Sequence, residues 1–321
     1  MNLPIRMNLQ QVIVLIFYIK SIHEQGVMAF TKYGNAIAVS GAAPCCGDVL
    51  DDEGNSGRYT SEWDWGNFYA INTQNQTVTK HRNLPNIVHG WGSWYDTITS
   101  TLYYAGSGHM ADTENRTDAA TTGLLFKTTD SGQTWTKVAD RNDGIGLYRT
   151  YDIIGIQNRL YVQFNDELSG ACSIAKSLDN GQTWVRLPNS EIRCATRLYA
   201  VNNDLVALSA DAKAFITIDA SDAVSAHSFD TQFQVSGYHT LSVDPYGNVY
   251  AGTKDGRIMH TVDFDKWTEI AHLEDTTIAF TSSTYWEEKQ WLVLGNWGEK
   301  ANLWKIPILN SDHKGLPDIL E

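Results

Sequence analysis

The chain has 321 residues, of which 42% are hydrophobic, 11% aromatic and 19% charged, and this composition excludes a disordered chain because it supplies ample apolar side chains for a core. The formal net charge of −13 at pH 7 excludes nucleic acid as a favoured partner, since a duplex dense in negative charge is repelled. Glycine, with 25 residues, far outnumbers proline, with 7, which is typical of a fold rich in strands and turns.

Residues 1–27 are predicted to be an N-terminal extension that precedes the folded region. The apolar run from Val12 to Ile19 is too short for a bilayer, which needs about 20 residues, so no transmembrane segment is expected. The same run lacks a small-x-small cleavage site. Two alternatives therefore stay open: a degenerate secretion signal, or an upstream extension of a protein that begins at Met28.

Short apolar or alternating segments recur along the chain, at intervals of about 45 residues where no long loop intervenes. Such segments predict β-strands, and several follow turn-forming residues. The six segments are residues 35–39, 101–105, 159–162, 204–208, 248–251 and 290–294. The last strand of the first unit is expected at residues 75–80, and that of the last unit at residues 302–306. A strand near residues 28–33, or the C-terminal tail, is expected to complete the first unit.

Two related segments follow the second and third of these strands, at residues 127–138 and 176–187. Both match the pattern Ser/Thr-x-Asp-x-Gly-x-Thr-Trp, which predicts a hairpin turn. The aspartate can accept turn amides, the glycine supplies a positive φ, and the tryptophan buries apolar area between neighbouring sheets. The residues assigned to these turns are Thr128, Asp130, Gly132 and Trp135 in one copy and Ser177, Asp179, Gly181 and Trp184 in the other. Weaker copies lie around Asp219 and Asp263.

Units of this length, with room for four short strands and no helical periodicity, predict an all-β fold of the β-propeller type. We expect four-stranded antiparallel blades, six rather than seven in number. The propeller is assigned to residues 28–310 and a C-terminal tail to residues 311–321.

At its two aspartate turns the chain resembles the sialidase-like superfamily of propellers, also called Asp-box or bacterial-neuraminidase-repeat proteins. That resemblance implies the architecture but no single activity, because the motif occurs in hydrolases, receptors, assembly factors and viral proteins. Sialidases of this superfamily carry an Arg-Ile-Pro signature near the first blade. Here Arg6 is followed by Met7 and precedes the propeller, so the resemblance implies the scaffold without sialidase activity.

In a propeller the first strand of each blade faces the central channel, so the residues at its start are candidates for ligand binding. Cationic and aromatic groups there could hold an anionic or sugar ligand; alternatively, they satisfy buried polar groups. The candidates are His89, Trp91, Tyr148, Arg149, Arg197, Tyr238 and His239. Asp152, Asp166, Glu167 and Glu191 lie in the same blades, but no spacing selects a catalytic pair, so catalytic residues stay unassigned.

Two long loops, residues 41–66 and 106–121, interrupt the repeat, and long loops on a rigid scaffold often carry function. The acidic residues Asp48, Asp51, Asp52 and Glu53 could hold calcium or form a solvated acidic loop. No cofactor is otherwise expected, and no Cys/His spacing predicts a zinc site. Of the four cysteines, Cys172 and Cys194 could form a disulfide or remain buried free thiols.

These features predict a non-catalytic recognition or structural propeller that binds a glycan or a protein partner. A virion- or tail-associated protein fits this description, and an extracellular or virion-surface location is expected. One alternative is an extracellular glycoside hydrolase in which Arg149 and Arg197 orient an acidic substrate. The other is an assembly factor or scaffold that uses the propeller face to bind proteins.

Overall fold

The computed structural model describes residues 27–34, 36–41, 49–50, 56–57, 65–72, 74–75, 77–85, 87, 89–107, 123–146, 148–166, 171–228, 241–273, 280–296 and 303–308. These residues divide between two compact units, Met1–Pro188 and Asn189–Glu321, which are considered in turn. The named helices in this part of the chain are single 3-10 turns, η3 (Arg141–Asp143) and η4 (Glu287–Lys289). No described helix has the length and apolar character needed to cross a membrane.

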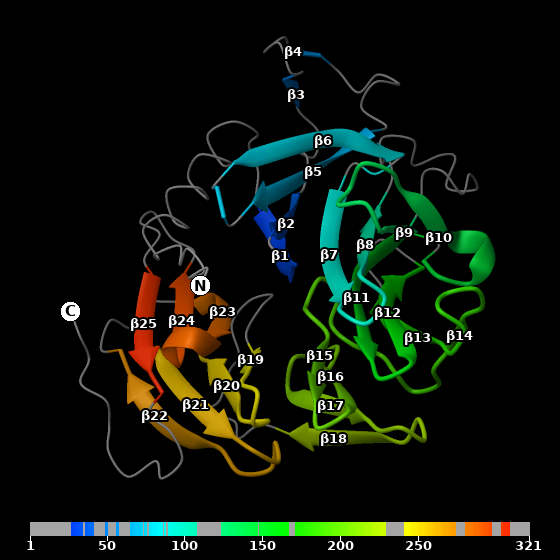
Figure 1. Cartoon of the computed structure of the whole chain (residues 1–321). Helices are drawn as coiled ribbons and strands as arrows, with labels where there is room; N and C mark the ends of the chain where they lie inside the picture. Colours follow the sequence, from blue (N-terminus) through cyan, green and yellow to red (C-terminus); the bar gives the residue numbers. More distant parts are fainter. Residues whose placement is uncertain are drawn as a thin grey trace. The chain divides into compact units, whose positions relative to one another are not determined.

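The first unit contains three four-stranded antiparallel sheets, in each of which the strands pair in chain order (Figure 1). The first sheet consists of β1 (Val27–Tyr33), β2 (Ala36–Gly41), β5 (Trp65–Asn72) and β6 (Val78–Pro85). The second consists of β7 (His89–Asp96), β8 (Thr101–Ser107), β9 (Gly123–Thr128) and β10 (Thr136–Ala139). The third consists of β11 (Arg149–Ile156), β12 (Arg159–Asn165), β13 (Ser173–Ser177) and β14 (Val185–Arg186). A separate two-stranded sheet pairs β3 (Val49–Leu50) with β4 (Ser56–Gly57).

The second unit contains three further antiparallel sheets of the same kind. The fourth sheet consists of β15 (Tyr199–Val201), β16 (Asp204–Leu208), β17 (Ala214–Ile218) and β18 (Val224–Ser228). The fifth consists of β19 (Leu241–Val243), β20 (Val249–Gly252), β21 (Arg257–Thr261) and β22 (Thr268–His272). The sixth has three described strands, β23 (Phe280–Trp286), β24 (Trp291–Asn296) and β25 (Leu303–Pro307).

The six sheets confirm the predicted fold class, an all-β, six-bladed β-propeller in which each sheet is one blade. Every segment of the predicted strand ladder falls on the second strand of a blade, from β2 to β24. The strand that completes the first blade is β1, the N-terminal alternative. One boundary was wrong: the strand expected at residues 75–80 begins at Val78. Asn72 Oδ1 accepts the Gln74 amide (2.9 Å) and Asn75 Oδ1 accepts the Thr77 amide (3.1 Å), so local turns occupy the earlier residues.

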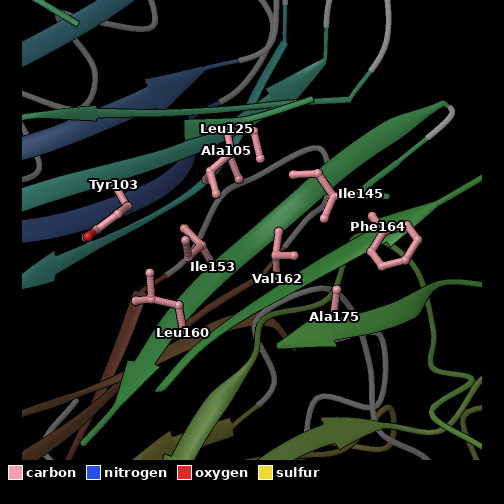
Figure 2. Packing of buried hydrophobic residues seen from close by; sticks show 10 residues of the cluster. Tyr103, Ala105, Leu125, Ile145, Ile153, Leu160, Val162, Phe164 and Ala175 are labelled. Carbon is pink, nitrogen blue, oxygen red and sulfur yellow. The ribbon is translucent and has the colours of Figure 1, made fainter. Parts of the chain in front are cut away.

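The core of the first unit lies between facing sheets, so strands inside a blade are buried on both sides. All seven residues of β8 and all seven of β12 are buried. Figure 2 shows Ala105 and Leu125 of the second sheet in one cluster with Ile153, Val162 and Phe164 of the third. This two-sided burial explains why these strands read as nearly continuous apolar runs rather than as an alternating pattern.

The turns of the second and third sheets are closed by the aspartates of the repeated motif. Asp130 Oδ1 accepts the Thr134 amide (2.9 Å), and its Oδ2 accepts the Thr134 hydroxyl (2.5 Å). Asp179 makes the same two bonds to Thr183, at 2.9 and 2.6 Å. These hydrogen bonds, above all those from the threonine side chains, lower the pKa of each aspartate to about 2.

The weaker copies keep the aspartate and its backbone hydrogen bonds. Asp219 Oδ1 accepts the amides of Ser221 (2.8 Å) and Ala223 (3.0 Å). Asp263 Oδ1 accepts the amides of Asp265 and Lys266, both at 3.0 Å. The turn aspartate therefore keeps its role even where the glycine of the full motif is replaced, and in the copy at Asp263 the Thr261 hydroxyl still accepts the Asp263 and Phe264 amides.

One turn is also tied to the preceding sheet, through the side chain of Asn83 on β6. Asn83 Nδ2 donates to the carbonyls of Gly132 and Gln133, each at 2.8 Å, and its Oδ1 accepts Trp135 Nε1 at 3.2 Å. The Trp135 ring packs edge-on against Phe68, with centroids 5.1 Å apart. The side-chain amide of Asn83 thus donates two hydrogen bonds and accepts one, and all three join the first sheet to the second. No pattern in the sequence predicts these three hydrogen bonds, which we call the Asn83 clamp.

Candidate functional site

The candidate site begins where the first strands of the second and third sheets, β7 and β11, come close together. A Cβ added at Gly92 on β7 would overlap the Tyr151 carbonyl and the Asp152 side chain on β11. Both strands are bulged here: the pairing of β7 skips Trp91, and the pairing of β11 skips Tyr151. A bulge re-aims a side chain, and these two bulged residues meet, with ring centroids 5.2 Å apart.

Arg149, the first residue of β11, lies against the same aromatic rings. Its Cζ atom is 4.8 Å from the centroid of the Tyr148 ring and 5.4 Å from that of Trp91. Both distances are within the range of a cation–π interaction. Trp91 is oriented by a hydrogen bond from its Nε1 to Ser107 Oγ, at 3.2 Å. We refer to Trp91, Tyr148, Arg149 and Tyr151 as the Arg149 cluster.

The Arg149 cluster carries a permanent positive charge beside a neutral phenol. Burial raises the pKa of Tyr151, while the charge of Arg149 and a hydrogen bond from it act in the opposite direction. Tyr151 therefore stays protonated at neutral pH, and arginine does not lose its proton in proteins. Arg149 and Trp91 are half-buried, whereas Tyr148 and Tyr151 are each 6% exposed. This arrangement can hold an anion, but it offers no group that exchanges a proton near pH 7.

The structure brings together three of the seven predicted binding residues: Trp91, Tyr148 and Arg149. His89 is the first residue of β7, where it pairs with Ser107. Arg197 lies in the second unit, half-buried and two residues before β15. Tyr238 and His239 fall outside the described residues. That all seven line one channel stays a prediction.

Tyr151 is the member of the cluster that sequence reasoning missed. It is the residue at which the pairing of β11 is interrupted, and no periodic pattern in the sequence marks that position. The one available signal was the pair of glycines around Trp91, because glycine inside a strand often marks a bulge or a close approach of two backbones.

Two of the described carboxylates near the cluster are unsuited to the accessible pair that a glycosidase uses. Asp152 is 1% exposed. Asp166 Oδ2 is held by Arg186 Nη1 at 2.9 Å, and the same guanidinium donates to Ser173 Oγ at 2.6 Å. Glu191 is exposed, and Glu167 lies outside the described residues. The acidic residues Asp48, Asp51, Asp52 and Glu53, for which calcium binding and a solvated loop were both open, also lie outside them.

Both described cysteines, Cys172 and Cys194, are disulfide-bonded. In the part of the chain that the structure describes, no cysteine is free. The alternative of buried free thiols is therefore wrong. Cys172 immediately precedes β13 and is fully buried.

Comparison with known proteins places the chain by its structure alone. No protein-family model and no curated protein matches the sequence. A structure of YCF48 bound to D1 peptide is 13% identical with a TM-score of 0.56, over 86% of this chain and 80% of that one. A streptogramin B lyase is 12% identical with a TM-score of 0.51, over 85% and 91%. A nidogen/laminin complex matches at 9% and 0.51, over 76% and 87%.

These likenesses support the β-propeller fold and, at such low identity, nothing finer. The proteins in question include one that is bound to a peptide, one that is a lyase and one in a protein complex. The same fold therefore serves both binding and catalysis, and a function for this chain must be argued from its own site.

Proposed function

We propose that the protein is a non-catalytic recognition propeller, related to the sialidase-like superfamily, which binds a carboxylate-bearing ligand through the Arg149 cluster. The observation that carries this proposal is the guanidinium of Arg149 held against the rings of Tyr148 and Trp91. The ligand is an acidic glycan displayed on a surface, and the protein acts outside a cell or on a virion.

The chemistry of the cluster favours a carboxylate over a neutral ligand. A guanidinium stacked on aromatic rings keeps its N–H donors in its own plane, where a carboxylate can accept two parallel hydrogen bonds. The whole protein has a net charge of −13, so most of its surface repels an anionic ligand. The positive charge of Arg149 attracts such a ligand at the cluster and therefore makes binding specific to that place. The ring of Trp91 adds an apolar face of the kind on which a sugar can stack.

The oxidised cysteines support the proposed location. Disulfides persist in extracellular and other oxidising surroundings and are rare where thiols are kept reduced. Cys172 and Cys194 are both disulfide-bonded, as expected for a protein that works at a surface.

A peptide is the second candidate ligand, and one specific observation favours it. The structural relative YCF48 is bound to a peptide, and the Arg149 cluster would accept a C-terminal or side-chain carboxylate as readily as that of a sugar. Parallel arrays of acidic glycans and acidic peptides separate the two ligands.

The test compares Arg149→Lys with a matched control, Arg186→Lys. Arg186 also lies over an aromatic ring, that of Phe164 at 5.2 Å, but belongs to β14 and pairs with Asp166. Loss of the bidentate fork should weaken binding of the captured acidic ligand by about 10-fold, whereas the control should bind like the unchanged protein. Equal binding by both variants, measured by titration calorimetry at one salt concentration, would refute the role of Arg149.

Catalysis is tested on the same variants. Turnover of a fluorogenic glycoside by the unchanged protein, abolished in Arg149→Ala, would establish the hydrolase alternative instead. We expect no turnover, because Asp166 is engaged by Arg186 and Asp152 is buried.

A further inference from the structure

The hairpin turn between β5 and β6 of the first sheet carries the sequence Asn75-Gln76-Thr77. This is the pattern Asn-x-Ser/Thr, with a middle residue other than proline, at which secreted proteins accept N-linked sugars. A second copy, Asn115-Arg116-Thr117, lies outside the described residues. So short a pattern recurs by chance, and only the surroundings of Asn75 distinguish this copy. We propose that Asn75 is an acceptor for an N-linked oligosaccharide.

Asn75 lies at the surface, where an attached sugar has room. Gln74, Asn75 and Thr77 are all exposed. They lie at the tip of the hairpin, which is closed by a hydrogen bond from the Asn72 amide to the Thr77 carbonyl at 2.9 Å. A bulky, hydrophilic oligosaccharide attached at this tip would extend into solvent.

The side chain of Asn75 is oriented by the threonine of the same motif. Its Oδ1 atom accepts the Thr77 amide at 3.1 Å and the Thr77 hydroxyl at 2.8 Å. The Asn75 amide donates to Asn72 Oδ1 at 3.3 Å, and the Gln74 amide donates to the same atom at 2.9 Å. Two successive side-chain turns therefore set the direction in which the Asn75 side chain leaves the backbone.

The two hydrogen bonds to Oδ1 suit the chemistry of glycosyl transfer. An amide nitrogen is a poor nucleophile, because its lone pair is delocalised toward the carbonyl oxygen. Donors at that oxygen stabilise the negative charge that develops there as Nδ2 loses a proton, as positioned donors do for other oxyanions. Asn75 Nδ2 makes no hydrogen bond to a described residue, so this nitrogen is open to react.

The donor in this reaction is a lipid-linked oligosaccharide diphosphate, presented by a transferase. Asn75 Nδ2 forms a bond to the anomeric carbon of the first sugar. The bond between that carbon and the diphosphate oxygen breaks, and its electron pair leaves with the lipid diphosphate. The proton lost from Nδ2 passes to a base of the transferase. No atom is oxidised or reduced.

The oxidised cysteines fit a chain that meets such a transferase. Cys172 and Cys194 are both disulfide-bonded, and disulfides form in the oxidising compartments through which secreted proteins pass. The inference does not depend on the Arg149 cluster, because Asn75 belongs to the turn between β5 and β6, whereas the cluster lies on β7 and β11 and on Tyr148 just before β11.

The experiment translates the full chain, behind a cleavable signal sequence, into endoplasmic-reticulum microsomes, with the second motif removed by Asn115→Gln. Chains that are protected from added protease have entered the lumen. We expect these chains to gain the mass of one oligosaccharide, which peptide-N-glycosidase removes.

Variants of the motif identify the acceptor and the role of the hydroxyl group. Asn75→Gln removes the acceptor, and Thr77→Val removes the hydroxyl but keeps a branched side chain, so both should lose the mass shift. Thr77→Ser keeps the hydroxyl and should keep the shift. Thr79→Val is the matched control, at an exposed threonine on β6 outside the motif, and should be modified like the unchanged chain.

A glycosidase-sensitive shift that Asn75→Gln and Thr77→Val abolish and Thr79→Val leaves intact supports the proposal. Protease-protected chains without the shift overturn it. A shift that persists in Asn75→Gln also overturns it, since the oligosaccharide would then be attached to another residue. A shift that persists in Thr77→Val would refute the role of the Thr77 hydroxyl.

Discussion

Replacement of Asn83 by alanine should destabilise the first unit by more than a surface substitution does. The side chain makes two hydrogen bonds to the carbonyls of Gly132 and Gln133 and accepts a third from Trp135 Nε1. Each is worth about 1 kcal/mol net, and the bond to Gln133 is exposed, so water replaces most of it. The expected loss is therefore about 2 kcal/mol. With a urea slope of about 2 kcal/mol/M, the midpoint should fall by about 1 M.

Asn83→Asp distinguishes the hydrogen bonds from the mere presence of a side chain. The acceptor for Trp135 is retained, but a carboxylate oxygen now faces the two carbonyl oxygens that Nδ2 served. Since an acceptor facing acceptors is worse than a gap that water can enter, Asn83→Asp should be less stable than Asn83→Ala at pH 7. Its stability should recover when the carboxyl group is protonated in acid.

The assay is urea unfolding followed by tryptophan fluorescence, with Asn142→Ala as the control because Asn142 is an exposed asparagine in the same unit. A double-mutant cycle with Trp135→Phe tests whether the clamp is shared: the two losses should add to more than the loss in the double variant. Equal urea midpoints for Asn83→Ala and Asn142→Ala would contradict the hydrogen-bonding role of Asn83, as would a higher stability of Asn83→Asp than of Asn83→Ala.

Two further predictions concern the turns of the repeated motif. The pKa values of Asp130 and Asp179 in the folded chain, about 2, lie below the usual 3.8; their contribution to stability should therefore be complete above pH 3.8 and lost as the pH falls toward 2. Urea midpoints measured across this range should show a slope that the double substitution by asparagine flattens, and an unchanged slope would contradict the assignment. Gly132→Ala combines a φ of +85° with overlap of Phe68, whereas Gly144→Ala has a similar φ of +83° and open space. The first should cost about 1–3 kcal/mol more, and equal midpoints would show that packing at Phe68 is not limiting.

The fold was predictable because its signals are local and repeated. A strand followed by an aspartate turn depends on residues within one hairpin, so the period survives where the glycine of the motif is lost, as around Asp219 and Asp263. The strand predicted at residues 75–80 was misplaced because Asn72 and Asn75 close side-chain turns that compete with strand pairing. The fourth strand expected in the sixth blade has no counterpart among the described residues.

The candidate site was predictable only in part, because its geometry depends on contacts between sheets. Arg149 and Trp91 could be selected by residue type and by their place at the start of a strand. That they touch follows from bulges in β7 and β11, which no periodic pattern reveals.

The turn at Asp219 shows how little of the motif a blade needs to retain. One carboxylate oxygen accepts the Ser221 and Ala223 amides at 2.8 and 3.0 Å and the Ser221 hydroxyl at 2.7 Å, and the turn closes without the glycine and the tryptophan of the full motif. Most residues of the motif can therefore be substituted in successive repeats while each hairpin turn still forms. Sequence comparison therefore stops detecting the repeats of such a chain before the fold changes, and structural comparison is needed to recognise them.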